Sequence, residues 1–258
     1  SHYYYKQLSL KDGVTSAVRC ILTDKQGFVW IGTKAGISRY DGHELKKYVH
    51  SPNNPHSIPN NLIHQIAEDE MSNIWILTDK GIARYQRQSD DFFLPTDEKG
   101  NPIIAYSTCL TKDGVLFGSK DKVYFYSYRD SSLRLLQKLN KGNNFNISLL
   151  SLWNEHTVLC CSRWQGLALL DLKTGKHRLP PFDCGKEIMN MLIDSQNRIW
   201  IAPYNEGIKC FTHNGELVKA YTTHNSDLSN NVVLSLAERE GKIWIGTCLL
   251  YTSPSPRD

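Results

Sequence analysis

Two short segments of the sequence each combine an aromatic residue with polar or charged groups. The first supplies a guanidinium, an indole and an amide, and the second a phenol, an amide and a carboxylate: Arg163, Trp164, Gln165, Tyr204, Asn205 and Glu206. An aromatic ring can stack on the C–H face of a sugar, while the polar groups hydrogen-bond to its hydroxyls. Arg163 can also bind a uronate or a sulfate through two parallel hydrogen bonds. We therefore expect these six residues to contact a saccharide. The alternative is that both aromatic rings only pack within the fold.

Other patterns that could carry chemistry are weak. Glu68, Asp69 and Glu70 are adjacent carboxylates, but a turn accounts for Asp69, and charges at strand ends are usually solvated. The histidines and the seven cysteines lack metal-ligand spacing. We expect the cysteines to be buried free thiols, with a disulfide left open for Cys184. No nucleophile elbow, phosphate loop or dinucleotide fingerprint is present. The sequence thus predicts no catalytic residue, no metal site and no cofactor.

A recurring strand-turn-strand pattern must position the two segments. Its fullest copy is DKQGFVWIGTKAGISRYDG (residues 24–42), and the second copy is DEMSNIWILTDKGIARY (residues 69–85). A Trp or an apolar equivalent recurs every 41 to 45 residues, at Trp30, Trp75, Leu116, Leu159, Trp200 and Trp244. Periods in the low forties without a helical stripe indicate one four-stranded sheet per repeat. The sequence predicts an all-β protein: a partial β-propeller of five complete four-stranded blades plus half of a sixth, out of an expected seven.

The first repeat predicts the layout of one blade. We expect strands over residues 17–23, 28–33, 37–40 and 45–49. A turn-initiating Asp accepts hydrogen bonds from backbone N–H groups two or three residues on, and it recurs as Asp24, Asp69, Asp113, Asp194 and, conservatively, Glu238. The tryptophans are expected to be buried between blades. Residues 56–61 and 226–231 align as the same connection between blades. These connections and the turns between second and third strands should share one end of the fold, where loops on a rigid scaffold bind ligands.

Composition narrows the possible partners. The 258-residue chain carries 30 basic and 26 acidic residues without charge runs, for a net charge of +4, so we expect no nucleic-acid partner. No apolar stretch is long enough to span a bilayer, and no signal-peptide pattern opens the chain.

The repeats resemble a known family. The runs at residues 24–42 and 60–85, and the opening YKQLSLKDGVTSAVRCILTDKQG, are similar to the two-component-regulator propeller repeat of periplasmic sensors in glycan-degrading bacteria. The resemblance implies an extracellular region of two seven-bladed propellers and an immunoglobulin-like domain. A membrane helix, a histidine kinase, a receiver and a helix-turn-helix regulator would follow. This chain departs from that pattern: its third and fourth copies lack the Trp, no kinase is present, and the sixth copy stops after its second strand.

The resemblance implies a function and a location. Residues 1–247 would be a partial propeller sensor domain in the periplasm, part of an inner-membrane receptor that detects oligosaccharides and controls genes for glycan use. Its partners would be the oligosaccharide, the downstream propeller, immunoglobulin-like and kinase domains of the parent chain, and a second copy in a homodimer. The fragment itself would not be an enzyme, although the parent would be a histidine kinase. Residues 248–258 resemble translated adapter sequence, and we expect a non-native, disordered tail.

Two functions from other classes remain open at this stage. A propeller enzyme acting on polysaccharide, either a lyase or a glycosidase, would need two carboxylates or a His/Tyr pair converging at the propeller axis. A protein-interaction scaffold similar to WD-repeat propellers would need neither. Saccharide turnover by the isolated chain would favour the enzyme, and protein capture without glycan affinity would favour the scaffold.

Overall fold

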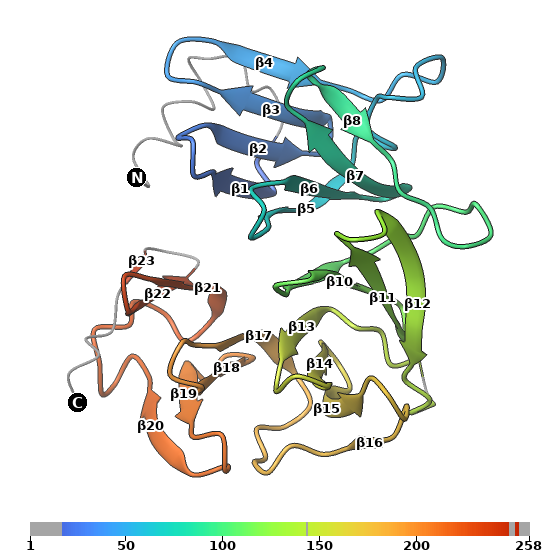
Figure 1. Cartoon of the computed structure of the whole chain (residues 1–258). Helices are drawn as coiled ribbons and strands as arrows, with labels where there is room; N and C mark the ends of the chain where they lie inside the picture. Colours follow the sequence, from blue (N-terminus) through green and yellow to red (C-terminus); the bar gives the residue numbers. More distant parts are fainter. Residues whose placement is uncertain (1–16, 143, 248–250, 253–258) are drawn as a thin grey trace. The chain divides into compact units, whose positions relative to one another are not determined.

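The computed structural model describes residues 17–142, 144–247 and 251–252 of the chain. Over these residues the secondary structure is entirely β, in six antiparallel sheets of consecutive strands (Figure 1). Five sheets have four strands and the sixth has three. We call the sheets blades one to six in chain order. The chain divides into two compact units, residues 1–136 and 137–258.

The first unit contains blades one to three. Blade one consists of β1 (Cys20–Thr23), β2 (Val29–Thr33), β3 (Gly36–Tyr40) and β4 (Leu45–Tyr48). Blade two consists of β5 (Ile63–Glu68), β6 (Ile74–Thr78), β7 (Gly81–Gln86) and β8 (Asp91–Phe93). Blade three consists of β9 (Ser107–Leu110), β10 (Gly114–Ser119), β11 (Lys122–Ser127) and β12 (Ser132–Lys138), whose last two residues belong to the second unit.

The second unit contains blades four to six. Blade four consists of β13 (Leu149–Leu152), β14 (Thr157–Ser162), β15 (Gly166–Asp171) and β16 (His177–Arg178). Blade five consists of β17 (Ile188–Ile193), β18 (Ile199–Pro203), β19 (Ile208–Phe211) and β20 (Leu217–Tyr221). Blade six consists of β21 (Val233–Arg239), β22 (Lys242–Thr247) and β23 (Tyr251–Thr252).

The predicted fold class and repeat layout are confirmed. The three outer strands of blade one match their predicted ranges to within one residue, whereas β1 begins three residues late, at Cys20. Blade six differs, because β23 pairs with β22 and adds a third strand. That strand lies within the predicted tail, whose other residues, 248–250 and 253–258, are outside the described part of the chain.

The Asp that starts the turn between first and second strands also anchors the tryptophan. In blade two, Asp69 Oδ1 accepts the N–H groups of Met71 at 2.9 Å and Asn73 at 2.8 Å, and Oδ2 accepts the Trp75 indole N–H at 2.7 Å. Asp24 and Asp194 repeat this arrangement. The backbone donors therefore lie two and four residues on, instead of two or three as predicted. Together, the bonds from the backbone and the indole explain why a buried carboxylate is tolerated.

Two turns that the sequence pattern assigned to the same motif are built differently. In blade three the hydroxyl of Thr111, and not the Asp113 carboxylate, accepts the N–H of Gly114 at 3.0 Å. In blade six, Glu240 and Gly241 both have positive φ, as in a two-residue type I′ hairpin, so no capping carboxylate is needed. The predictions for Asp113 and Glu238 as turn-capping residues were wrong.

Glu238 instead joins two blades. Its carboxylate accepts the backbone N–H of Ser195 in the turn of blade five at 3.1 Å. Glu68 makes the equivalent bond at 3.0 Å to the N–H of Lys25 in the turn of blade one. We had expected the carboxylate of Glu68 to be solvated at the end of its strand; instead, it makes a contact between two blades.

Within each unit, the hydrophobic core lies between successive blades. Trp30 of blade one packs with Tyr85 of blade two at a ring-centroid distance of 4.8 Å, and Trp75 packs in the same way with Tyr126 of blade three. Trp30, Trp75 and Trp200 are buried as predicted. Trp244 is 41% exposed, contrary to prediction, since the described residues contain no blade after the sixth to cover it.

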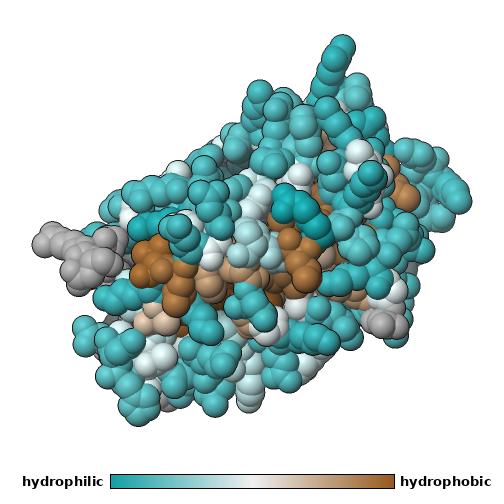
Figure 2. Space-filling model, turned by 90° about the horizontal axis from the view of Figure 1, so that it is seen from below, coloured by the Kyte–Doolittle hydropathy of each residue, from teal (hydrophilic) through white to brown (hydrophobic). Residues whose placement is uncertain are grey.

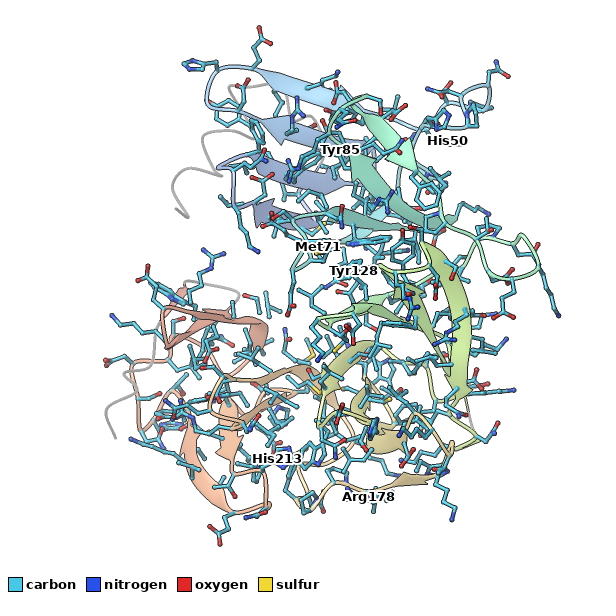
Figure 3. All side chains as sticks on the ribbon, in the orientation of Figure 1. His50, Met71, Tyr85, Tyr128, Arg178 and His213 are labelled. Carbon is cyan, nitrogen blue, oxygen red and sulfur yellow. The ribbon has the colours of Figure 1, made fainter. Side chains whose placement is uncertain are left out.

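A partly buried polar network reinforces the first of these interfaces. Asp90 Oδ1 accepts the hydroxyls of Tyr48 at 2.5 Å and of Tyr85 at 2.6 Å, and Lys46 bonds to Oδ2 (Tyr85 is labelled in Figure 3). The Arg39 guanidinium lies 3.6 Å from the same carboxylate. Desolvation and the neighbouring Tyr85 raise the pKa of Tyr48 above its ordinary value. Five residues therefore join blades one and two at their outer edges: four from strands β3, β4 and β7, and Asp90 from the turn between β7 and β8.

The surface is mostly hydrophilic on the face shown in Figure 2, where hydrophobic residues are confined to patches. Among the described residues, no helix is long and apolar enough to cross a membrane. The six described cysteines are free thiols.

Candidate ligand-binding site

The two sequence segments expected to bind a saccharide lie in equivalent turns of neighbouring blades in the second unit. Arg163, Trp164 and Gln165 connect β14 to β15, and Tyr204, Asn205 and Glu206 connect β18 to β19. Each turn is followed by a glycine with positive φ, 82° for Gly166 and 72° for Gly207. A Cβ on Gly207 would lie 2.1 Å from the carbonyl oxygen of Tyr221, so the close approach of the outer strand requires a glycine here.

One peptide group holds the two turns together. The carbonyl of Glu187 accepts the N–H of Tyr204 at 2.9 Å, and the next N–H, that of Ile188, donates to the carbonyl of Arg163 at 3.1 Å. Both groups belong to the same planar peptide unit, which places the backbone N of Tyr204 within about 8 Å of the backbone O of Arg163. The two turns are therefore neighbours, fixed by the connection between their blades.

A third backbone bond fixes this connection. The carbonyl of Lys186 accepts the N–H of Gly166 at 3.0 Å. The carbonyl of Asn231 accepts the N–H of Gly207 at 2.9 Å in the same way, and the carbonyl of Asn61 accepts that of Gly36 at 2.8 Å. The contact between a turn glycine and the connection to the next blade is thus a repeated feature of the fold, and in blade four it anchors the wall of the site.

A pocket lies between the connection and the turn of blade five. Its volume is about 460 Å³, within the range of roughly 300–1,000 Å³ common for small-molecule sites. It is lined by Cys184, Gly185, Lys186, Glu187, Tyr204, Asn205 and Glu206. The lining therefore contains three of the six predicted residues and offers one aromatic ring, one amide, one ammonium and two carboxylates. Arg163, Trp164 and Gln165 are not part of the lining.

Both aromatic rings are available to a ligand. Trp164 is 63% exposed and Tyr204 is 52% exposed, so neither ring is buried between blades. The alternative considered from the sequence, burial of both rings within the fold, is therefore not what the structure has.

The Arg163 side chain is held above Trp164. Its guanidinium carbon lies 5.3 Å from the indole centroid, within the range of a cation–π contact. Its Nη2 lies 3.5 Å from the sulfur of Met189 on β17. These contacts orient the guanidinium at the turn, where its remaining N–H groups can face a ligand.

Burial disfavours ionisation of the Cys184 thiol in the pocket wall. Burial raises the pKa of Cys184 to about 12, and the carboxylates of Asp183 and Glu206 act in the same direction, while the Lys209 ammonium opposes them. The thiolate, which is the nucleophilic form, is therefore disfavoured. Among the described residues, no group of three or more His, Cys, Asp and Glu side chains is arranged to hold a metal ion.

The connecting segment, residues 184–187, was not identified from the sequence. It lacks the recurring Asn pair of the two aligned connections at residues 56–61 and 226–231. The segment could have been found from its place between two repeats, because the connections between blades and the turns were expected at the same end of the fold. The sequence located both turns but not the wall between them.

Two segments of the chain match a known family of propeller repeats. The sequence pattern of the family described as two component regulator propeller matches residues 12–35 and 227–248. Histidine kinase P4 of Formosa agariphila is 37% identical over 59 residues, which is 22% of this chain and 4% of that protein. The chain thus spans a small part of the curated relative that it matches.

Solved structures share the fold at low sequence identity. The extracellular domain of a B. thetaiotaomicron protein described as the hybrid two component system BT3049 aligns with a TM-score of 0.69 and 19% identity, over 90% of this chain and 32% of that one. The extracellular domain described as that of the one component system BT4673 gives a TM-score of 0.73 and 17% identity, over 95% and 35%. PorZ of Porphyromonas gingivalis gives 0.68 and 16%, over 92% and 38%. The chain spans about a third of each of these structures.

Proposed function

We propose that this chain, a two-component-regulator propeller, detects oligosaccharides outside the cytoplasm as the sensor part of a signalling receptor. The extracellular domains among the structural neighbours support an extracytoplasmic location, and we propose the periplasm. The signal would pass to a downstream propeller, an immunoglobulin-like domain and a histidine kinase of the parent chain. A homodimer of the sensor region would be one means of transmitting it.

One observation carries the choice of ligand: a single peptide group joins two turns, each with an exposed aromatic ring, beside a pocket lined with polar groups. Sugar rings present an apolar C–H face and a rim of hydroxyls. Trp164 and Tyr204 would stack on such faces, and Asn205 and the carboxylates of Glu187 and Glu206 would bond to the hydroxyls. Arg163 and Lys186 would donate hydrogen bonds to a sulfate or a carboxylate on the same chain of sugars.

Two rings on neighbouring turns suit an oligosaccharide better than a single sugar. Each ring can contact one sugar residue, and linking two weak contacts in one ligand raises the effective concentration for the second contact. We therefore expect affinity to rise steeply from the monosaccharide to the tetrasaccharide.

The test is direct binding. The 258-residue chain is screened on a glycan array, and the strongest oligosaccharide is titrated by calorimetry against the wild type and the variants Trp164→Ala and Tyr204→Ala. Each variant should weaken binding by at least about tenfold, the equivalent of ~1.4 kcal/mol. Leu217→Ala, which truncates an exposed apolar residue on β20, is the matched control and should bind as the wild type does. Unchanged affinity in both aromatic variants would refute the site.

A further inference from the structure

A second cluster of polar and aromatic side chains lies in the first unit, at the entry to the innermost strands. One residue per blade occupies the same position at the start of the first strand. The residue after it pairs with the second-to-last residue of the second strand. The pairs Cys20↔Gly32, Gln65↔Leu77 and Ser107↔Gly118 define it. The residues at this position are Arg19, His64 and Tyr106.

A β-bulge sets the direction of the His64 side chain, the middle of the three. The register of β5 against β6 shifts between Ile63 and Gln65, so His64 is the extra residue of a β-bulge. Bulges redirect a side chain out of the alternating pattern of a strand, and they are frequent beside binding sites. His64 is thereby turned toward the end of the blade that carries the turn between β6 and β7.

Three contacts tie the cluster together. The Nε2 of His64 lies 3.1 Å from Oδ1 of Asp79 in that turn. The ring of Tyr106, on the connection into blade three, lies 4.7 Å from the imidazole. Arg19 Nε donates to the carbonyl of Ile63 at 2.9 Å, which fixes the guanidinium next to the bulge. Side chains from three consecutive blades therefore meet at one place.

Several polar atoms of the cluster are available for hydrogen bonds to a ligand. Tyr106 is 46% exposed, although its ring is large and apolar. Over the described part of the chain, the Nη atoms of Arg19, the Nδ1 of His64 and the hydroxyl of Tyr106 have no hydrogen-bond partner in the protein. An accessible ring with fixed donors and acceptors around it has the composition of a ligand site.

The equivalent positions in the second unit have a different chemistry. There the same position is occupied by Ser148, Met189 and Leu234. The pairs that define it are Leu149↔Cys161, Asn190↔Ala202 and Ser235↔Gly246. The concentration of a guanidinium, an imidazole and a phenol in the first unit is thus a property of these side chains and not a requirement of the fold.

We infer that Arg19, His64, Asp79 and Tyr106 form a second saccharide-binding site, selective for a neutral sugar ring. Tyr106 stacks on the ring, Asp79 and His64 bind neighbouring hydroxyls, and Arg19 donates to a hydroxyl or ring oxygen. The formal charges of Arg19 and Asp79 cancel, so the site has no excess positive charge to attract an anionic sugar. The choice of a saccharide rests on the proposed function, whereas the location rests on the geometry of the cluster alone.

The test uses the imidazole resonances of the 258-residue chain in ¹³C–¹H NMR, with the His64 peak identified by its loss in His64→Gln. The probes are cellotetraose, maltotetraose, mannotetraose and xylotetraose, with tetragalacturonate as the anionic comparison. At least one neutral tetrasaccharide should shift the His64 peak, and Tyr106→Ala should weaken that binding by at least about tenfold. Leu110→Ala, an exposed apolar truncation on β9, is the matched control and should leave the shift unchanged.

The outcomes separate the two sites. A constant His64 peak with every probe, or tighter binding of tetragalacturonate than of the neutral sugars at this peak, overturns the second site. Calorimetry on Trp164→Ala and Tyr204→Ala reports on the first site. If these variants lose binding while no probe shifts the His64 peak of the wild type, the proposed function stands and only this inference is removed.

Discussion

The buried carboxylate of blade two offers the sharpest test of how the repeats are held together. Asp69 is 1% exposed, and its two oxygens accept four hydrogen bonds, from the N–H groups of Met71 and Asn73, the Asn73 side-chain amide at 3.0 Å and the Trp75 indole. The substitution Asp69→Ala removes every acceptor at once. The Trp75 donor is fully buried, so it would be stranded without water.

The magnitude follows from these bonds. A hydrogen bond to a charged group contributes about 1.5–3 kcal/mol, and stranding a buried donor costs about 1–3 kcal/mol. The turn N–H groups lie nearer the surface and recover part of the loss by binding water. We therefore expect Asp69→Ala to lower the free energy of unfolding by about 3–5 kcal/mol, measured by urea unfolding with tryptophan fluorescence.

Two controls make this result specific. Glu70→Ala truncates the exposed neighbouring carboxylate and should change the free energy of unfolding by less than about 0.5 kcal/mol. Trp75→Phe removes the indole donor, so Asp69→Ala should cost less in that background. A loss below about 1 kcal/mol in the wild-type background, or the same loss in both backgrounds, would refute the reasoning.

Three further predictions concern other parts of the chain. Trp75→Ala should cost about 3–5 kcal/mol in urea unfolding, because it empties a fully buried site, whereas Trp164→Ala should cost less than about 0.5 kcal/mol because the ring is exposed; equal losses would contradict the assigned environments. Burial alone would raise the pKa of Asp194, but hydrogen bonds from Trp200 and Arg198 and the Arg198 charge lower it, so its stabilisation is present above about pH 4 and is lost as the pH falls through the depressed value. Acid titration of Asp194→Asn should accordingly show a shallower loss of stability below about pH 4 than the wild type, and an unchanged slope would count against this. Burial raises the pKa of the Cys161 and Cys184 thiols to about 12, so at pH 8 they should react with a disulfide reagent only after unfolding; rapid reaction in the native state would show that they are accessible.

The sequence was sufficient for the repeat and most of its strands, because both depend on local periodicity. The Asp-to-Trp spacing of six residues located Asp24, Asp69 and Asp194 at their turns and placed β2, β6 and β18 directly after them. The contacts between blades could not be predicted from local periodicity. Glu68 and Glu238 bond across blades to residues 43 positions earlier, a relation that no local pattern expresses.

The candidate sites show the same division. Both turns of the first site follow from their place in the repeat, but its wall at residues 184–187 has no repeated signature. His64 had been counted among the histidines without a site, because a β-bulge changes the direction of a side chain without a reliable mark in the sequence. Trp244 matched the repeat pattern yet is exposed, since burial depends on the neighbouring blade and not on the motif.

The most direct test of the account is an indole ¹H–¹⁵N NMR titration of the 258-residue chain with the strongest oligosaccharide from the glycan array. The chain has six tryptophans, and Trp164→Phe identifies the Trp164 peak. The account predicts that the Trp164 peak shifts with saturation, while the peaks of the buried Trp30 and Trp75 stay in place. An oligosaccharide that binds by calorimetry but leaves the Trp164 indole unchanged would contradict the proposed site.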